Sequence, residues 1–201
     1  MSATLRSVSP RAERPSIPDE ADFIARLAGG SLSALAHAYD RWHQRVRVLA
    51  RRLLSDDAAA EDVVQEVFAA LPRAVRRFRG EAGLETFLLA VAVKRARHHQ
   101  RAAMQRRRAL ARLEGEERSG PRDPEQQAYR HELARRLADA LDELPLAQRV
   151  AFVLCAVEGL TSGEAAAIAR VPEATIRTRL HHARRRLRTL LPEELGRWAR
   201  P

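Results

Sequence analysis

The sequence predicts an all-α protein, with two small helical domains joined by a flexible charged linker. Apolar residues recur at helical spacing through most of the 201 residues, and no useful stretch alternates as a strand would. Only 4% of the residues are aromatic although 45% are hydrophobic, so the cores must be built from Ala, Leu and Val, a composition that favours helices. The apolar periodicity fades over residues 102–126, where charge, glycine and proline are dense. This segment is the predicted linker.

The first domain is expected over residues 21–101, after a proline-containing disordered leader at 1–20. Phe23, Ile24 and Leu27 form a short helical stripe that Gly29-Gly30 ends. A longer stripe follows and comprises Leu32, Leu35, Ala36, Tyr39, Val46, Leu49 and Leu53. Residues 55–57 (SDD) then supply a helix stop and a new N-cap. The next stripe comprises Val63, Val64, Val67, Phe68 and Leu71.

An Arg- and Gly-rich loop at 76–85 leads to the last helix of the first domain. Thr86 is expected to cap this helix, which begins with apolar residues and becomes basic after Val93. The second domain is expected over 127–191, before a tail at 192–201. Leu133, Leu137, Leu141 and Leu144 line its first helical face, Pro145 begins the next helix and Gly159 ends it.

Residues 159–191 carry the most specific local pattern. Thr161 and Glu164 fit a capping box at the start of a short helix, 162–169. Residues 170–172 form a turn, and a second helix begins near Glu173 with Ile176, Leu180, Ala183, Leu187 and Leu190 inside. This arrangement is a helix-turn-helix, whose second helix fits the major groove of DNA.

The charge of the chain is unevenly distributed. The net charge is +10 and the pI about 11.2, which favours a polyanionic partner. Residues 94–112 carry +8 and residues 173–191 carry +5, so the remainder of the chain carries −3. That remainder includes an acidic helix with Asp56, Asp57, Glu61, Asp62 and Glu66. Two interpretations of these acids stay open: they complement the helix macrodipole, or they meet a basic partner.

Several classes of protein are disfavoured. The longest apolar run, 150–157, is too short to cross a bilayer, so no membrane insertion is expected. The single cysteine, Cys155, is expected to be a packed core thiol. Adjacent histidines such as His98-His99 point about 100° apart on a helix and make a poor metal chelate. No catalytic triad, glycine-rich phosphate loop or metal-ligand cluster stands out, so the sequence predicts a cytoplasmic protein that is not an enzyme and has neither cofactor nor metal.

Two sets of motifs resemble bacterial extracytoplasmic-function (ECF) sigma factors. Region 4 of that family is similar to residues 142–145 (DELP), 148–149 (QR), 158–161 (EGLT), Pro172 and 175–184 (TIRTRLHHAR). Residues 60–68 (AEDVVQEVF) resemble region 2.2, and residues 78–82 (FRGEA) and 86–88 (TFL) resemble regions 2.3 and 2.4. The two sets stand in the family's order, and the resemblance covers roughly residues 22–191.

The resemblance implies three binding sites. Region 2.2 docks on a coiled coil of core RNA polymerase, which assigns Glu61, Asp62, Gln65 and Glu66 to that contact. The melted −10 element of promoter DNA would be held by Arg79, Gly80, Glu81, Thr86, Lys94, Arg95, Arg97 and Arg101. The −35 element would be read by Arg177, Thr178, Arg179, His181 and His182, with Arg185 and Arg186 on the DNA backbone. Family members are often held by an anti-sigma factor, which is a further expected partner.

The chain departs from the family pattern at several positions. Phe87 stands where tryptophan is frequent, Leu89 where an aromatic residue is frequent and Lys94 where asparagine is common. Arg170 occupies a turn position that is often glycine, so a left-handed backbone there would cost free energy. These departures bear on promoter sequence and on melting.

Two other functions remain as alternatives. A stand-alone helix-turn-helix regulator would bind duplex DNA as a dimer, but it would need neither the acidic helix nor the basic 94–112 segment. A nonspecific binder of RNA or membranes would bind tightly, lose that binding with salt and show no sequence preference. The sequence favours the sigma factor, which uses both signs of charge.

Overall fold

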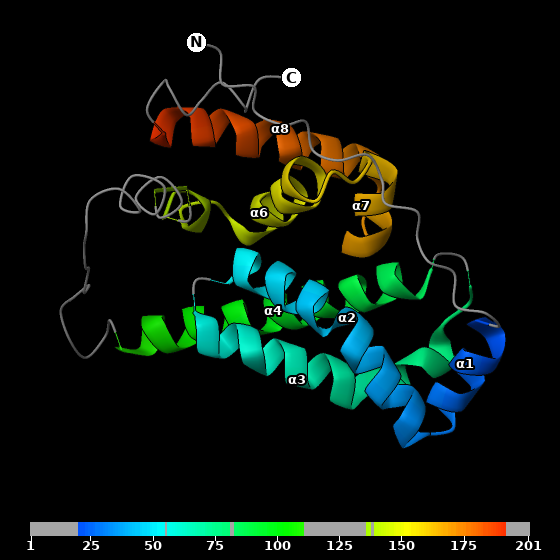
Figure 1. Cartoon of the computed structure of the whole chain (residues 1–201). Helices are drawn as coiled ribbons and strands as arrows, with labels where there is room; N and C mark the ends of the chain where they lie inside the picture. Colours follow the sequence, from blue (N-terminus) through cyan, green and yellow to red (C-terminus); the bar gives the residue numbers. More distant parts are fainter. Residues whose placement is uncertain (1–19, 55, 81–82, 111–135, 138, 192–201) are drawn as a thin grey trace, which may run out of the picture.

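The computed structural model describes residues 20–54, 56–80, 83–110, 136–137 and 139–191 (Figure 1). The described part is helical and contains no strand, which confirms the predicted all-α class. Most of the predicted leader and linker, the C-terminal tail, and the predicted Ser55, Glu81 and Leu133 lie outside the described residues. No helix in the described ranges is long and apolar enough to cross a membrane.

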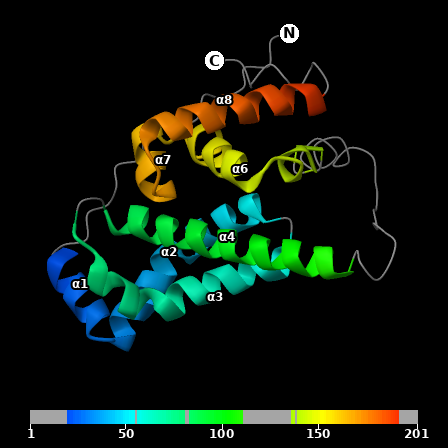
Figure 2. The same ribbon diagram turned by 180° about the vertical axis from the view of Figure 1, so that it is seen from behind.

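The helices form two tiers, which Figures 1 and 2 show from opposite sides. The lower tier, here called the N-terminal unit, contains α1 (Glu20–Ala28), α2 (Leu32–Leu53), α3 (Asp57–Ala74), the short 3₁₀ helix η1 (Val75–Arg77) and α4 (Leu84–Leu110). The upper tier, the C-terminal unit, contains α6 (Leu146–Phe152), η2 (Val153–Val157), α7 (Ser162–Ala169) and α8 (Glu173–Leu190). Residues 139–142 are also helical.

Local signals place most of the helix starts. The Ser31 side chain accepts a hydrogen bond from the Ala34 N–H at the start of α2. Asp56 does the same for α3, where its Oδ1 accepts from the N–H groups of Ala58 and Ala59 at 2.9 and 3.2 Å. Pro145 occupies the N-cap of α6, as expected. These three residues fix where the chain enters each helix.

The predicted cap at Thr86 is wrong. α4 begins two residues earlier, at Leu84, so that Thr86 lies inside the first turn. The Leu84 N–H donates instead to Oε1 of Glu20, at 3.3 Å. A carboxylate from α1 therefore satisfies a free N–H at the start of α4, which no local pattern could indicate. At its other end α4 continues through Leu110 and includes the first residues of the predicted linker.

The apolar core runs from the lower tier into the upper one. One continuous buried cluster includes Leu27, Leu53 and Leu71 of the N-terminal unit together with Leu154 and Ile176 of the C-terminal unit. A smaller cluster holds α8 on α6 and the 139–144 segment, with Leu141, Leu144, Phe152, Ala183 and Leu187 at its centre. The two units are thus packed on each other through apolar side chains.

Four predicted core residues are exposed instead: Leu32, Ala36, Tyr39 and Leu190. Leu32, the first residue of α2, is 81% exposed. Tyr39 is exposed at 39%, with its ring stacked on His43 and its edge against Phe68. Leu190, at the end of α8, is 43% exposed. Val64 and Phe68 are buried, as predicted.

Candidate functional site

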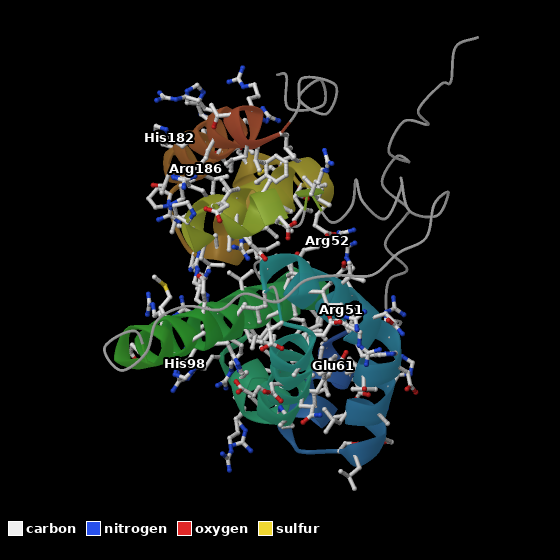
Figure 3. All side chains as sticks on the ribbon, turned by 90° about the vertical axis from the view of Figure 1, so that its left-hand side faces the viewer. Arg51, Arg52, Glu61, His98, His182 and Arg186 are labelled. Atoms are coloured by element: carbon white, nitrogen blue, oxygen red, sulfur yellow. The ribbon has the colours of Figure 1, made fainter. Side chains whose placement is uncertain are left out.

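The acidic face of α3 divides into paired and exposed residues. Oε1 of Glu61 lies 2.9 Å from Nε of Arg47, and Arg51 approaches the same oxygen at 3.9 Å. Glu66 lies 3.2 Å from NH1 of Arg95 and 3.0 Å from Nε2 of His99. Figure 3 shows Glu61 of α3 on the same side of the N-terminal unit as Arg51 of α2. Two of the four residues predicted to meet the polymerase therefore already have partners within this chain.

Asp62 and Gln65 are the exposed members of that predicted set. They lie on α3 between the two paired glutamates, one turn apart. An exposed carboxylate is available to a partner at low desolvation cost, whereas a carboxylate held by two arginines must exchange one ion pair for another. The structure thus makes Asp62 the most available of the four predicted contact residues to a basic surface.

An open cavity of about 710 Å³ lies against the N-terminal half of α4. Its lining includes four predicted −10 residues: Arg79, Thr86, Lys94 and Arg95. Phe78 and Phe87 form one wall, with ring centroids 5.3 Å apart in a T-shaped arrangement. Cationic groups beside exposed aromatic surface are the elements with which proteins hold single-stranded nucleic acid.

Two cavity residues were not singled out from the sequence. Arg77 and Phe78 both line the cavity, next to the predicted Arg79. Phe78 begins the FRGEA motif, so the motif itself was the available signal. Phe87 is half-buried and contributes to the wall.

The other predicted −10 residues lie elsewhere. Gly80 is exposed and has a left-handed backbone, with φ of 73°, and Glu81 is outside the described residues. Arg101 is exposed farther along α4. Arg97 is half-buried beneath α7 and donates from NH1 to the carbonyl oxygen of Ala169, at 3.1 Å. Burial first, and then the guanidinium groups of Arg179 and Arg101, lower the pKa of Arg97.

The helix-turn-helix forms as predicted. The Glu164 N–H donates to Oγ1 of Thr161 at 3.2 Å, and the Thr161 N–H donates to Oε2 of Glu164 at 3.0 Å, which completes the capping box. α7 spans Ser162–Ala169 and α8 begins at Glu173, both at the predicted residues. Ile176, Ala183 and Leu187 are buried and hold α8 in place.

The outer face of α8 presents most of the predicted −35 residues. Six of them are exposed: Arg177, Thr178, His181, His182, Arg185 and Arg186. Figure 3 shows His182 and Arg186 on α8, at the end of the molecule away from α3. Arg179 is half-buried, and its positive charge contributes to the lowered pKa of Arg97 on α4. Arg177 pairs with Glu173 one turn earlier on the helix.

Cys155 follows α6 within η2 and is half-buried. Burial raises the pKa of its thiol, and nearby Arg184 opposes that rise. A raised pKa keeps the thiol protonated at neutral pH, which agrees with the predicted packing role.

Arg170 adopts a left-handed conformation, as the glycine that is frequent at this position in the resembling family implied, with φ of 53° and ψ of 53°. It is the one described residue other than glycine with a positive φ.

Glycine at position 170 would remove a backbone strain of about 1–2 kcal/mol but would add conformational freedom to the unfolded chain. We therefore expect Arg170→Gly to raise the free energy of unfolding by about 0.5–1 kcal/mol, measured by thermal unfolding. Ala167→Gly, inside α7, is the matched control and should lower it by about 1 kcal/mol; equal losses in both variants would contradict the assignment of strain to Arg170.

Comparison with known proteins agrees with this geometry. Residues 38–107 match the family Sigma-70 region 2, and residues 134–187 match Sigma-70, region 4. The ECF RNA polymerase sigma-E factor of Haemophilus influenzae is 30% identical over 170 residues, covering 80% of this chain and 89% of that protein. The solved structure of CnrH in complex with the cytosolic domain of CnrY has a TM-score of 0.58 and 25% identity, covering 84% of this chain and 94% of CnrH. The sigma factor RpoE of Bartonella quintana, solved with the anti-sigma factor NepR, has the same fold, with a TM-score of 0.56, 24% identity and coverage of 77% and 94%.

The chain belongs to the sigma-70 family, as an ECF sigma factor. Its function is to bind core RNA polymerase and direct transcription initiation at promoters, which the family membership favours over a stand-alone regulator. The N-terminal unit contains most of region 2, and the C-terminal unit contains most of region 4.

Proposed function

We propose a residue-level division of this function between three surfaces. Asp62 and Gln65 of α3, flanked by Glu61 and Glu66, contact core polymerase. The cavity against α4 holds the unpaired strand of the −10 element. The outer face of α8 reads the −35 element as duplex. One observation carries the proposal: the N-terminal unit presents an acidic row on α3 and forms most of a cationic, aromatic-walled cavity against α4, to which Ala167 and Arg170 of the C-terminal unit also contribute.

Opposite charges on separate faces fit a protein that bridges two partners. The acidic row would repel DNA phosphates, while the cavity residues Arg79, Lys94 and Arg95 attract them. Charge complementarity of this kind directs each partner to its own face and fixes the orientation of the complex. A chain that only held nucleic acid would have no use for the exposed carboxylate of Asp62.

The direct test is reconstitution with core RNA polymerase. Purified chain and core enzyme should co-elute and should start run-off transcription at a promoter with matching −35 and −10 elements. Core enzyme alone should give no such transcript. If the chain and the core enzyme do not associate, the proposal fails.

The −35 assignment predicts two different effects on α8. Arg177, near the N-terminal end of the helix, should contact a base edge, where a bidentate contact contributes about 1–3 kcal/mol of discrimination. Arg186, two turns later, should contact phosphate. Arg177→Ala is therefore expected to change which −35 sequences are preferred. Arg186→Ala should weaken binding to all −35 sequences alike. It should also lower the salt dependence of the binding constant by the amount that corresponds to about one phosphate contact.

Both effects are measured by binding a library of duplex −35 sequences to the full chain. Arg26→Ala, a change on α1 far from α8 in sequence, is the control for loss of positive charge and should leave the preference unchanged. Identical sequence profiles for the two α8 variants would contradict the division.

The remaining expectations follow from the family. We propose that the chain acts as a dissociable subunit without catalytic activity of its own, in the cytoplasm where core polymerase is. An anti-sigma factor is a proposed further partner, since RpoE was solved with one and CnrH was solved with a cytosolic domain of a second protein.

A further inference from the structure

The first and last residues of α1 each contact the chain on one side of the connection between η1 and α4. At the N-terminal end of α1, Oε1 of Glu20 accepts a hydrogen bond from the Leu84 N–H, at 3.3 Å. At its C-terminal end, the Ala28 carbonyl accepts a hydrogen bond from Nε of Arg76, at 3.1 Å. The ribbon views place α1, η1 and the start of α4 at the same end of the N-terminal unit (Figures 1 and 2). α1 therefore bridges the two segments that the connection joins.

Both contacts match a charged side chain with a helix end of opposite partial charge. The N–H groups of the first turn of a helix and the carbonyls of its last turn have no partner within that helix, and they give its ends partial positive and negative charge. Glu20 brings a carboxylate to the start of α4, and Arg76 brings a guanidinium to the last carbonyl of α1. Each contact is therefore favourable both as a hydrogen bond and as a charge interaction.

α1 is itself held firmly on the rest of the N-terminal unit. Phe23 and Leu27 are 7% and 0% exposed, and both belong to the main apolar cluster. The Phe23 ring lies 5.5 Å from the ring of His37 and 6.2 Å from that of Trp42, both on α2. A helix of nine residues separates its first and last residues by about 12 Å along its axis. α1 thus acts as a spacer of fixed length between the two contacts.

The residues next to these contacts form the aromatic wall of the cavity against α4. Phe78 lies two residues after Arg76, and Phe87 lies three residues after Leu84, in the first turn of α4. Both phenylalanines line the cavity, as do their neighbours Arg79 and Thr86. Glu20 and Arg76 do not belong to the lining, so they act on the cavity only through the wall that they hold.

We propose that Glu20 and Arg76 are positioning residues for recognition of the −10 element. Through α1 they set the distance between the Phe78 side and the Phe87 side of the wall. Loss of either contact lets the two sides move relative to each other, which weakens the preference for one −10 sequence over the others. The inference rests on the function proposed above, in which this cavity holds the unpaired −10 strand.

Three substitutions at Glu20 separate the hydrogen bond from the charge. Glu20→Gln keeps an acceptor oxygen at the same reach but is neutral, whereas Glu20→Asp keeps the charge on a side chain one methylene shorter. Glu20→Ala removes both. The positioning role predicts that Glu20→Gln behaves as the parent does, and that Glu20→Asp and Glu20→Ala lose the contact. Net charge alone predicts a different order, because removal of any carboxylate should tighten the binding of a phosphate chain.

The other end of α1 is tested by Arg76→Ala, which should have the same effect as Glu20→Ala. Arg73→Ala is its control, since it removes an exposed arginine three residues earlier, near the end of α3. Asp22→Ala is the control for Glu20→Ala, since it removes an exposed carboxylate of α1 that pairs with Arg26. Neither control residue belongs to a surface assigned to polymerase or DNA.

The contact at Glu20 is measured without polymerase or DNA, by hydrogen exchange of the Leu84 amide in the full chain. Exchange should be about fivefold faster in Glu20→Ala and Glu20→Asp, the factor that loss of a typical helix cap produces. It should be unchanged in Glu20→Gln and Asp22→Ala. Unchanged exchange in Glu20→Ala would show that the contact does not hold the start of α4, and would overturn the inference.

Recognition is measured with holoenzyme, reconstituted from core polymerase and the full chain. The DNA is a library with a fixed −35 duplex and an unpaired, randomised −10 strand. The parent should enrich a subset of −10 sequences, and Glu20→Ala, Glu20→Asp and Arg76→Ala should lower that enrichment about fivefold. Glu20→Gln and the two controls should retain it. In a second library with a randomised −35 duplex, all variants should show the parent's preference, because α8 is unaltered.

The two libraries distinguish the possible outcomes. A −10 preference equal to that of the parent in Glu20→Ala and Arg76→Ala would overturn the positioning role. Loss of the −35 preference together with the −10 preference would indicate general unfolding, and would overturn it as well. A parent holoenzyme without any −10 preference would instead refute the function proposed for the cavity, and the Leu84 exchange would still report whether Glu20 holds α4.

Discussion

Replacement of Arg149 by methionine is expected to lower the free energy of unfolding by about 2–4 kcal/mol, because two carbonyl oxygens lose their donor at about 1–3 kcal/mol each. Arg149 is 2% exposed, which makes it the most deeply buried charged residue in the described part of the chain. Its NH1 lies 2.7 Å from Oδ1 of Asp142 and donates to the Leu53 carbonyl, and its NH2 donates to the Asp142 carbonyl at 2.8 Å. Methionine fills the same space but leaves both carbonyl oxygens without a donor.

The burial of Arg149 is itself unfavourable. Burial lowers the pKa of the guanidinium, and Asp142 only opposes that effect. The group is therefore retained because its removal exposes unpaired acceptors, and not because a buried charge is stabilising in its own right. Asp142 is 37% exposed and regains water when Arg149 is lost, whereas the Leu53 carbonyl faces the packed interface.

Urea unfolding of the full chain measures this effect. Arg26→Met is the control, since both members of its pair with Asp22 are more than half exposed. Such pairs contribute about 0–1 kcal/mol. Arg149→Lys should fall between the two, because one ammonium group cannot reach both carbonyls and the carboxylate. Equal unfolding midpoints for Arg149→Met and Arg26→Met would show that the hydrogen bonds of Arg149 stabilise the fold no more than an exposed ion pair does.

Charge reversal at Asp62 is expected to weaken binding of core polymerase by tenfold or more, a change of about 1.4 kcal/mol per factor of ten. Asp62 is exposed and lies on the acidic row, so Asp62→Lys alters the contact surface with little effect on folding. Glu61 and Glu66 are poorer sites for this test, because their reversal would break ion pairs with Arg47 and Arg95 within the chain.

The measurement is a titration of labelled chain with core enzyme. Asp22→Lys makes the same change in net charge on exposed α1 and should bind as the parent does. Isolated −35 duplex should bind both variants equally, which separates loss of polymerase contact from general unfolding. Equal polymerase affinity for Asp62→Lys and Asp22→Lys would contradict the role of the acidic row.

Local patterns in the sequence predict local structure well in this chain. The capping box of Thr161 and Glu164 and the N-cap at Asp56 each depend on residues within four positions of one another. The left-handed turn at Arg170 was instead expected from the family resemblance. The exposed face of α8 follows from helical periodicity alone, apart from Arg179.

The features that escaped prediction join distant segments. Glu20 caps α4 from a position 64 residues away, and Glu66 meets His99 across 33 residues. Arg97 looked like a free DNA-binding cation in the sequence, but the structure places it beneath α7. Charge patterns reveal which signs of charge a helix carries; they do not reveal which of those charges the fold has already neutralised.

The wide helical turn η2 sets the direction of the Glu158 side chain, which forms ion pairs with Arg45 and Arg52 of α2. Val153–Val157 forms a π-helix directly after α6, and the Glu158 N–H donates to the Val153 carbonyl five residues back, at 2.9 Å. An ordinary α-helix advances about 100° per residue, so a turn that accommodates one extra residue changes the phase of everything after it by about that angle. Deletion of one residue in this turn would restore a regular α-helix and rotate the Glu158 carboxylate away from α2. One extra residue in η2 thus helps to set how the C-terminal unit is oriented on α2. An insertion or deletion in η2 would change that orientation without altering the sequence of the helix-turn-helix.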